Sequence, residues 1–133
     1  VADLETNFDK TLPPVPCLPG EFNQVILNLI VNASHAIADA VAGTEKKGNI
    51  RVSTVRVAER VEVRISDPGT GVPKKVQPRI FEPFFTTKEV GKGTGQGLAI
   101  ARSAIVDKHG GTIVFETEER RGTTFIIRLP ISV

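Results

Sequence analysis

Apolar residues between positions 22 and 40 recur at intervals of three and four, which is the spacing of one buried helix face. We predict a long helix that begins after Gly20 and ends at Gly43. Upstream, prolines at four positions between 13 and 19 indicate an irregular connector, and loose alternation over residues 4–9 predicts a short strand. The apolar face of the predicted helix consists of Phe22, Val25, Ile26, Leu29, Ile30, Ala33, Ala36, Ile37 and Ala40.

Apolar and polar residues alternate one by one in two later segments, 49–56 and 60–66, which predicts antiparallel strands joined by a turn near Ala58 and Glu59. Residues 98–109 return to helical spacing, and the Gly110-Gly111 pair predicts where that helix stops. Residues 112–117 and 123–129 then alternate again, as the two strands of a closing hairpin.

Size and composition bound the class of protein. A chain of 133 residues that is 40% hydrophobic has the size and apolar content of one ordinary domain. A net charge of +2 does not argue for a nucleic-acid partner, and the lone Cys17 excludes an internal disulfide and a CxxC metal site. The longest apolar stretch, residues 22–38, is interrupted by polar side chains, so it does not predict a membrane span. Because the chain contains no methionine, we expect an excised domain or a processed product.

The segment 79–98 consists of two parts of different composition, the first rich in phenylalanine and the second rich in glycine. Phe81, Phe84 and Phe85 surround Pro83, and glycine then occupies every other position from 91 to 97. Such a glycine content does not sustain regular structure, and it lets bare backbone N–H groups approach a ligand beside a helix N-terminus. We therefore predict a loop that closes over the phosphates of a nucleotide, although neither the G-x-G-x-x-G fingerprint nor the P-loop pattern fits. The alternative is a plain surface connector.

The predicted first helix carries a polar stripe. Asn28, Asn32 and His35 follow the i, i+4, i+7 spacing, which places them within about 60° of one another. Asparagine is a poor helix former, but its amide oxygen is a hard ligand that suits Mg²⁺ and adds no charge to repel phosphate. The alternative is an ordinary solvated face, because Glu21 and Asp39 lie on the same side.

The second predicted strand runs into a turn over residues 67–73. Pro68 followed by Gly69 predicts a type II turn with a positive φ at Gly69, and Pro68 favours an extended Asp67. A carboxylate held at a strand end beside two glycines suits a ligand that lies flat on exposed backbone, and the exocyclic amine of adenine is a suitable donor to it. The alternative is an ordinary turn aspartate.

Taken in order, these segments resemble the catalytic ATP-binding domain of sensor histidine kinases, in the superfamily that includes gyrase, Hsp90 and MutL. Residues 21–38 resemble the N box, 67–71 the G1 box, 81–85 the F box, 93–98 the G2 box, and 122–125 the last glycine motif. Each motif alone is weak. Five of them in family order and spacing, over nearly the whole chain, form a specific pattern.

The resemblance implies an α/β fold, namely a two-layer α/β sandwich of the Bergerat ATP-binding type. A mixed, mostly antiparallel sheet would pack on about three helices, and ATP would lie beneath a mobile lid. Residues 1–133 would form one histidine kinase catalytic ATP-binding domain that lacks the dimerisation and phosphoacceptor domain. The domain would be cytoplasmic, in a parent protein that can be anchored in a membrane.

The resemblance also implies roles for single residues. Asn32 would hold the Mg²⁺ that bridges the phosphates, with Asn28 beside it, Asp67 would accept from the adenine amine, and Thr123 would line the adenine pocket. Pro68 departs from the family pattern, because the G1 box usually has asparagine there, and proline supplies neither an amide side chain nor an N–H.

Further implied roles concern the phosphates. Lys88 and the backbone of residues 93–98 would meet them, Gly69 and Gly71 would let the base approach, and His35 stands where many relatives carry lysine or arginine. For His35, the alternative is a bystander on the helix. The predicted metal ligand is Asn32, and the predicted cofactor-binding residues are Asn28, Asn32, His35, Asp67, Gly69, Gly71, Val72, Lys88, Gly93, Thr94, Gly95, Gln96, Gly97, Leu98 and Thr123.

The residue at position 28 favours phosphoryl transfer over ATP hydrolysis. The ATPase branch of the superfamily places a general-base glutamate four residues before the metal asparagine, and this chain has Asn28 there, an amide that does not take a proton from water. We therefore expect phosphoryl transfer from Mg·ATP to a histidine. His35 and His109 are not followed by an acidic residue, unlike family acceptors, so the acceptor is expected on an upstream dimerisation domain.

Several partners follow from this expectation. The full-length protein would pass the phosphoryl group to a response regulator and form a homodimer, whereas this domain would be a monomer without a nucleic-acid partner. An ATPase of the gyrase and Hsp90 kind, a degenerate nucleotide-binding module and a serine-directed kinase are the alternatives.

Overall fold

The computed structural model describes residues 2–8, 19–40, 48–82, 97–119 and 121–131. Within them, regular structure follows the predicted order of strand, helix, hairpin, helix and hairpin. The elements are β1 (Ala2–Asn7), α1 (Pro19–Ala40), β2 (Gly48–Val57), β3 (Arg60–Asp67), the 3-10 turn η1 (Gln77–Arg79), α2 (Gly97–Ser103), the π-helical turn η2 (Ala104–Lys108), β4 (Thr112–Glu118) and β5 (Gly122–Pro130).

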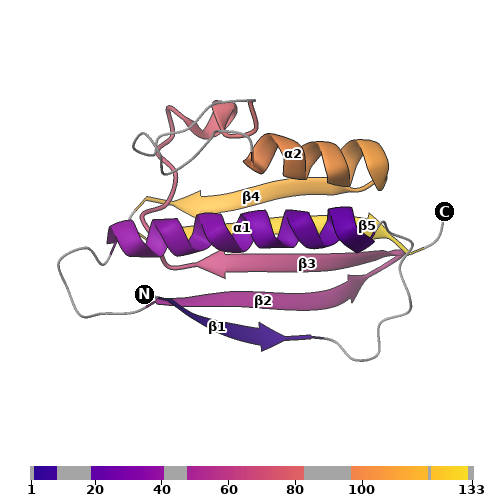
Figure 1. Cartoon of the computed structure of the whole chain (residues 1–133), viewed down its shortest axis with the longest axis horizontal. Coiled ribbons are helices and arrows are strands. Elements are labelled where there is room, and N and C mark those ends of the chain that lie inside the picture. Colours follow the sequence, from indigo (N-terminus) through magenta and orange to yellow (C-terminus); the bar gives the residue numbers. More distant parts are fainter. Residues whose placement is uncertain (1, 9–18, 41–47, 83–96, 120, 132–133) are drawn as a thin grey trace.

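The five strands form one sheet in the order β1-β2-β3-β5-β4. β1 pairs with β2 in parallel, and every other neighbouring pair is antiparallel. The sheet is therefore mixed and mostly antiparallel, as predicted. The long crossover between the parallel strands β1 and β2 contains α1, because two parallel neighbours cannot be joined by a tight turn (Figure 1).

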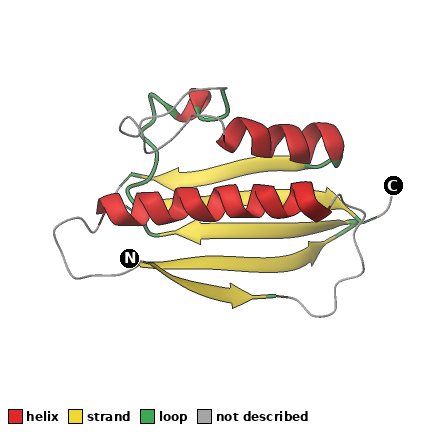
Figure 2. Ribbon diagram, in the orientation of Figure 1, coloured by secondary structure: helices red, strands yellow, loops and turns green. Residues whose placement is uncertain are grey.

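Both helices lie on one face of the sheet, which makes the two-layer sandwich that was predicted (Figures 1 and 2). The buried stripe of α1, with Val25, Leu29 and Ile37 at most 1% exposed, packs in one core with Ile65 and Ile127 of the sheet. Burial of each such side chain contributes about 1.5–3 kcal/mol. The described residues hold two main helices and the 3-10 turn, against the expectation of about three helices.

The second helix differs from the regular helix predicted over residues 98–109. After Ser103 the α-helix widens into the π-helical turn η2. The ring nitrogen Nδ1 of His109 lies 2.8 Å from the carbonyl oxygen of Ala104, five residues earlier, and the Gly111 N–H donates to the Ile105 carbonyl at 2.9 Å. These bonds satisfy carbonyls at the widened end, and Gly110 then leaves the helix with φ +65°.

The opposite face of the sheet is not covered by a helix in the described part of the chain (Figure 1). Glu62 on β3 is only 4% exposed there, because Arg64 and Arg128 reach its two carboxylate oxygens at 2.7 Å and 3.0 Å. The Arg64 hydrogen bond, with help from Arg128, holds the pKa of Glu62 below its usual range despite the burial. Among the described residues, no helix is long and apolar enough to cross a bilayer.

Candidate functional site

Several chain segments converge at one end of the sheet, the left end in Figure 1. The carboxyl ends of β3 and β4, the amino end of β5, the C-terminal half of α1 and the start of α2 all lie there (Figure 1). The fold thus gathers the predicted N-box helix, the G1 turn and the last glycine motif, which are far apart in the sequence.

Asp67 ends β3 on the helix-covered side of the sheet, two residues after the core residue Ile65. It is 9% exposed, and its Oδ1 accepts a hydrogen bond from the Gly69 N–H at 2.8 Å. Burial raises the pKa of Asp67 from 3.8 to about 6, and the Gly69 bond only partly opposes that shift. At neutral pH the residue is an ionised, largely buried carboxylate with one oxygen bonded to the Gly69 N–H.

The turn after Asp67 is not the predicted type II turn. Gly69 does not have a positive φ, and Gly71, two residues later, adopts φ +75° instead. Gly69 is required for space, because a Cβ there would lie 2.6 Å from the Cβ of Ala36 on α1. Gly71 is required both for its positive φ and for space, since a Cβ there would also clash with the Glu118 carbonyl oxygen. The glycines let this turn pass between α1 and the β4–β5 hairpin.

Three polar residues form a row across the sheet at this end. Asp67 on β3 pairs with Thr123 on β5, and Thr123 pairs with Thr117 on β4. The Oγ1 atom of Thr117 lies 2.9 Å from the Thr123 Oγ1, 2.9 Å from the Val72 nitrogen and 3.1 Å from the Gly122 carbonyl oxygen. Thr117 therefore ties the G1 turn to the hairpin.

The sequence prediction included Asp67, Val72 and Thr123 but missed Thr117. One signal was available, because Thr117 and Thr123 flank the predicted hairpin turn symmetrically and so face each other across the two strands.

Two register positions further along the strands, on the same face of the sheet, the row becomes aromatic. Phe115 on β4 and Phe125 on β5 pair with each other, and Phe81 packs against both, with ring centroids 5.9–6.3 Å apart. The first residue of the predicted F box is thereby anchored to the sheet directly beside the polar row.

The polar stripe of α1 is half-buried. Asn28, Asn32 and His35 all have intermediate exposure, and Asn28 Oδ1 accepts from the Gln24 amide at 3.0 Å. The described residues contain no group of three or more His, Cys, Asp or Glu side chains that could hold a metal ion. Neutral amide oxygens still fit Mg²⁺ when phosphate oxygens and water complete its coordination, which is how Mg²⁺ commonly accompanies nucleotides.

Comparison with known proteins decides the family. The family model of histidine kinase-, DNA gyrase B- and HSP90-like ATPases matches residues 18–133. The chain belongs to this family. It is an ATP-binding domain of the sensor histidine kinase type, which confirms the resemblance seen in its motifs.

Similar curated proteins include the sensor kinase CckA of Brucella abortus, which is 41% identical over 96% of this chain and 14% of CckA. The sensor histidine kinase ZraS of Escherichia coli is 37% identical over 98% of this chain and 26% of ZraS. The chain therefore spans about a quarter or less of the length of these two relatives.

Two solved structures show the same fold. The nucleotide-free catalytic domain of histidine kinase ThkA matches with a TM-score of 0.81 and 32% identity, over 99% of this chain and 82% of that one. Full-length ShkA in complex with AMPPNP matches with a TM-score of 0.79 and 26% identity, over 97% of this chain and 25% of that one.

The predicted phosphate loop of this histidine kinase domain is only partly described. Lys88, Gly93, Thr94, Gly95 and Gln96 lie outside the described residues, as does Gly43, the predicted end of the first helix. Gly97 is the first residue of α2, and the half-buried Leu98 packs against the core. A helix does begin at the end of the glycine-rich segment, and the anion loop itself stays a prediction.

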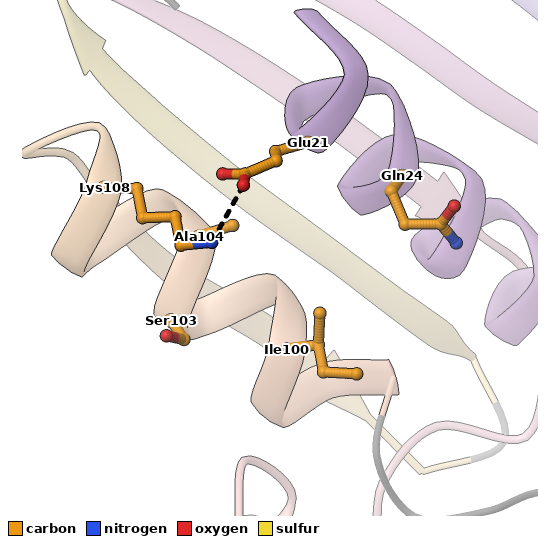
Figure 3. Close-up of a pocket in the computed structure, with 6 residues that line it drawn as sticks. All are labelled: Glu21, Gln24, Ile100, Ser103, Ala104 and Lys108. Atoms are coloured by element: carbon orange, nitrogen blue, oxygen red, sulfur yellow. Dashed lines mark hydrogen bonds and ion pairs between the residues drawn. The ribbon is translucent and has the colours of Figure 1, made fainter. Parts of the chain in front are cut away.

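A hollow of about 380 Å³ lies between the beginning of α1 and α2 (Figure 3). Its rim carries an ion pair between the Glu21 Oε1 and the Lys108 Nζ at 2.9 Å. None of the predicted ATP-binding residues lines it, so it is separate from the polar row. The lining residues are Glu21, Gln24, Ile100, Ser103, Ala104 and Lys108.

Proposed function

We propose that this domain binds ATP with Mg²⁺ and transfers the γ-phosphoryl group to a histidine on a separate dimerisation domain, in two-component signal transduction. The observation that carries the proposal is the buried pair of Asp67 and Thr123, held side by side at the end of the sheet where the N-box helix and the G1 turn meet. Family membership supplies ATP as the ligand.

The base would bind over the G1 turn. One Asp67 oxygen already accepts the Gly69 N–H, so the other oxygen would accept the adenine amine. An ionised carboxylate is the stronger acceptor, and the raised pKa of about 6 still leaves Asp67 ionised at neutral pH. Gly69, Gly71 and Val72 would present backbone to the flat base.

The triphosphate would extend along α1. Asn32 would contribute an amide oxygen to Mg²⁺, with Asn28 beside it, while Lys88 and the backbone of residues 93–98 would contact phosphate oxygens. When bound, the metal supplies positive charge that offsets the charge developing on the transferred group. His35 lies on the same stripe, and a role for it as a neutral phosphate contact is part of the proposal.

Transfer rather than hydrolysis is proposed because of Asn28. The ATPase branch places a glutamate at that position, whereas the Asn28 side chain is neutral and its oxygen accepts from Gln24. Such an amide does not remove a proton from water at neutral pH. Water bound near the γ-phosphate would therefore lack a base here.

The acceptor histidine is proposed to lie outside this domain. His109 is half-buried, with its Nδ1 2.8 Å from the Ala104 carbonyl oxygen and its ring centre 6.2 Å from the ring centre of Phe22. His35 is half-buried on α1. We propose that the acceptor belongs to a helical dimerisation domain of the parent protein. Homodimerisation, the response regulator and any membrane anchor would likewise be properties of that parent.

The test is phosphotransfer in trans. The domain is incubated with ATP labelled on the γ-phosphate, Mg²⁺ and the purified phosphoacceptor domain of the same parent. We expect acid-labile phosphate on the acceptor domain, none on this domain, and no transfer by the Asn32→Ala variant. Release of free phosphate that is abolished by Asn28→Ala would instead support an ATPase. Absence of ATP binding would support a degenerate module.

A further inference from the structure

We infer that Thr117 determines base specificity: it fixes the Thr123 hydroxyl as a hydrogen-bond acceptor, so that the pocket selects a 6-amino purine over a 6-oxo purine. The inference rests on the proposed function, since it concerns the base end of the same site. Thr117 acts through Thr123 and is a positioning residue.

The donor directions follow from the partners of Thr117. A threonine hydroxyl has one hydrogen to donate and two lone pairs that accept. The Val72 N–H, at 2.9 Å, can only donate to Thr117, and the Gly122 carbonyl, at 3.1 Å, can only accept from it. The single hydrogen of Thr117 is thereby assigned to Gly122. The remaining contact, at 2.9 Å from Thr123, is satisfied when Thr123 donates into the second lone pair of Thr117.

This assignment commits the only hydrogen of Thr123. Its oxygen can then only accept from a ligand, and the adjacent ionised Asp67 likewise only accepts. Two neighbouring acceptors match an exocyclic amine, which carries two N–H donors. A 6-oxo group would instead present an acceptor to both of them.

Burial makes the mismatch costly. Thr123 is 7% exposed and Asp67 is 9% exposed, so an acceptor facing either of them would have little compensation from water. Sites built to hydrogen-bond one polar group strongly reject the analogue that lacks it, because the buried groups of the protein are then left unpaired. Thr117 is itself half-buried and points into this network rather than into solvent.

The test compares ATP with inosine triphosphate. Inosine carries a 6-oxo group in place of the 6-amino group, and its N1 carries a hydrogen that adenine N1 lacks. Dissociation constants for both, with Mg²⁺, are measured by calorimetry for the unmodified domain, Thr117→Val and Thr117→Ser. Valine keeps the shape of threonine and removes the hydroxyl, whereas serine keeps the hydroxyl. In Thr117→Val the Thr123 hydroxyl is released and can rotate to donate to a 6-oxo group.

The unmodified domain should prefer ATP. Thr117→Val should lower the ratio of the dissociation constant for inosine triphosphate to that for ATP by about five- to tenfold, the effect of one buried hydrogen bond. Thr117→Ser should preserve this ratio. Equal weakening of both nucleotides in Thr117→Val would show a purely structural role and overturn the inference. So would an unmodified domain that binds both equally, although the proposed function would then stand. Binding of neither nucleotide would refute the proposed function itself.

Discussion

At the scale of single residues, Asp67 is a charged group in a place that disfavours charge. Its pKa is about 6 in the folded domain, against 3.8 for an exposed aspartate. Because the folded state binds the proton more tightly, the contribution of Asp67 to stability is fully present below pH 3.8 and is lost as the pH rises through about 6. At neutral pH the fold therefore carries a cost that a ligand donating to the carboxylate would relieve.

Asp67→Asn should accordingly stabilise the nucleotide-free domain at pH 7.5. The full shift would correspond to about 3 kcal/mol, and partial access to solvent reduces the expected gain to roughly 1–2 kcal/mol. The asparagine oxygen can still accept the Gly69 N–H, so the turn keeps its bond. Urea denaturation at pH 7.5 and at pH 4 measures the difference.

The gain should nearly vanish at pH 4, where Asp67 is protonated in the unmodified domain. The same substitution should weaken ATP binding, because an amide N–H₂ would face the adenine amine. A variant that is less stable at pH 7.5 would contradict the account of Asp67.

At the scale of elements, the contact between the G1 turn and α1 sets the spacing between that turn and the helix at the site. Gly69 lies against Ala36, and the turn passes the β4–β5 hairpin at Gly71 with no room for a Cβ at either position. The helix, the turn and the hairpin are therefore packed through backbone, with a spacing that one methyl group would change.

Gly69→Ala tests this packing. The added Cβ would lie 2.6 Å from the Ala36 Cβ and 2.7 Å from its carbonyl carbon, so the turn or α1 must move. We expect a loss of about 1–3 kcal/mol in the free energy of unfolding and weaker ATP binding. Gly20→Ala is the matched control, since its Cβ meets nothing within 4 Å at the start of α1. Equal stability of the two variants would show that the turn tolerates the methyl group.

The elements were largely predictable from the sequence, because amphipathic spacing reports burial directly. The stripe of α1 and the alternation in β2 to β5 placed each element within a few residues. The π-helical turn was not predictable, since five residues do not resolve its period and the His109–Ala104 contact favours it. Gly69 was misread as a conformational requirement because its partner, Ala36, is distant in the sequence. Thr117 was missed because its role arises from three contacts made only in the folded hairpin.

At the scale of the whole molecule, the two faces of the sheet differ in composition and in role. The helix-covered face holds the core and the polar row at one end, whereas the other face is held by charged side chains. Glu62 is central there, with Arg64 and Arg128 on its two oxygens. Its pKa lies below the ordinary value of 4.5, so its contribution to stability is present above that pH and is lost as the pH falls through the folded pKa.

Glu62→Gln should therefore destabilise the domain at pH 7 by about 1–2 kcal/mol, because glutamine keeps one oxygen acceptor for one guanidinium and turns an amide N–H₂ donor toward the other. The difference should disappear in acid, below the folded pKa of Glu62. Glu5→Gln is the control, since its ion pair with Arg51, at 3.4 Å, joins two exposed side chains and should contribute little. ATP binding should be unchanged in both variants, because both residues lie on the face opposite the polar row. A loss of ATP affinity in Glu62→Gln would contradict this separation.

The central claim is that the Asp67 end of the sheet holds the base of a Mg²⁺-bound ATP. Calorimetric titration of the domain with AMPPNP, with and without Mg²⁺, tests it most directly. The account predicts saturable binding of one nucleotide per domain. Binding should be weaker without Mg²⁺, and it should also be weaker in Asp67→Asn, although the stability of that variant is unchanged or higher. Absence of binding to the folded domain, or an affinity that Asp67→Asn leaves intact, would contradict it.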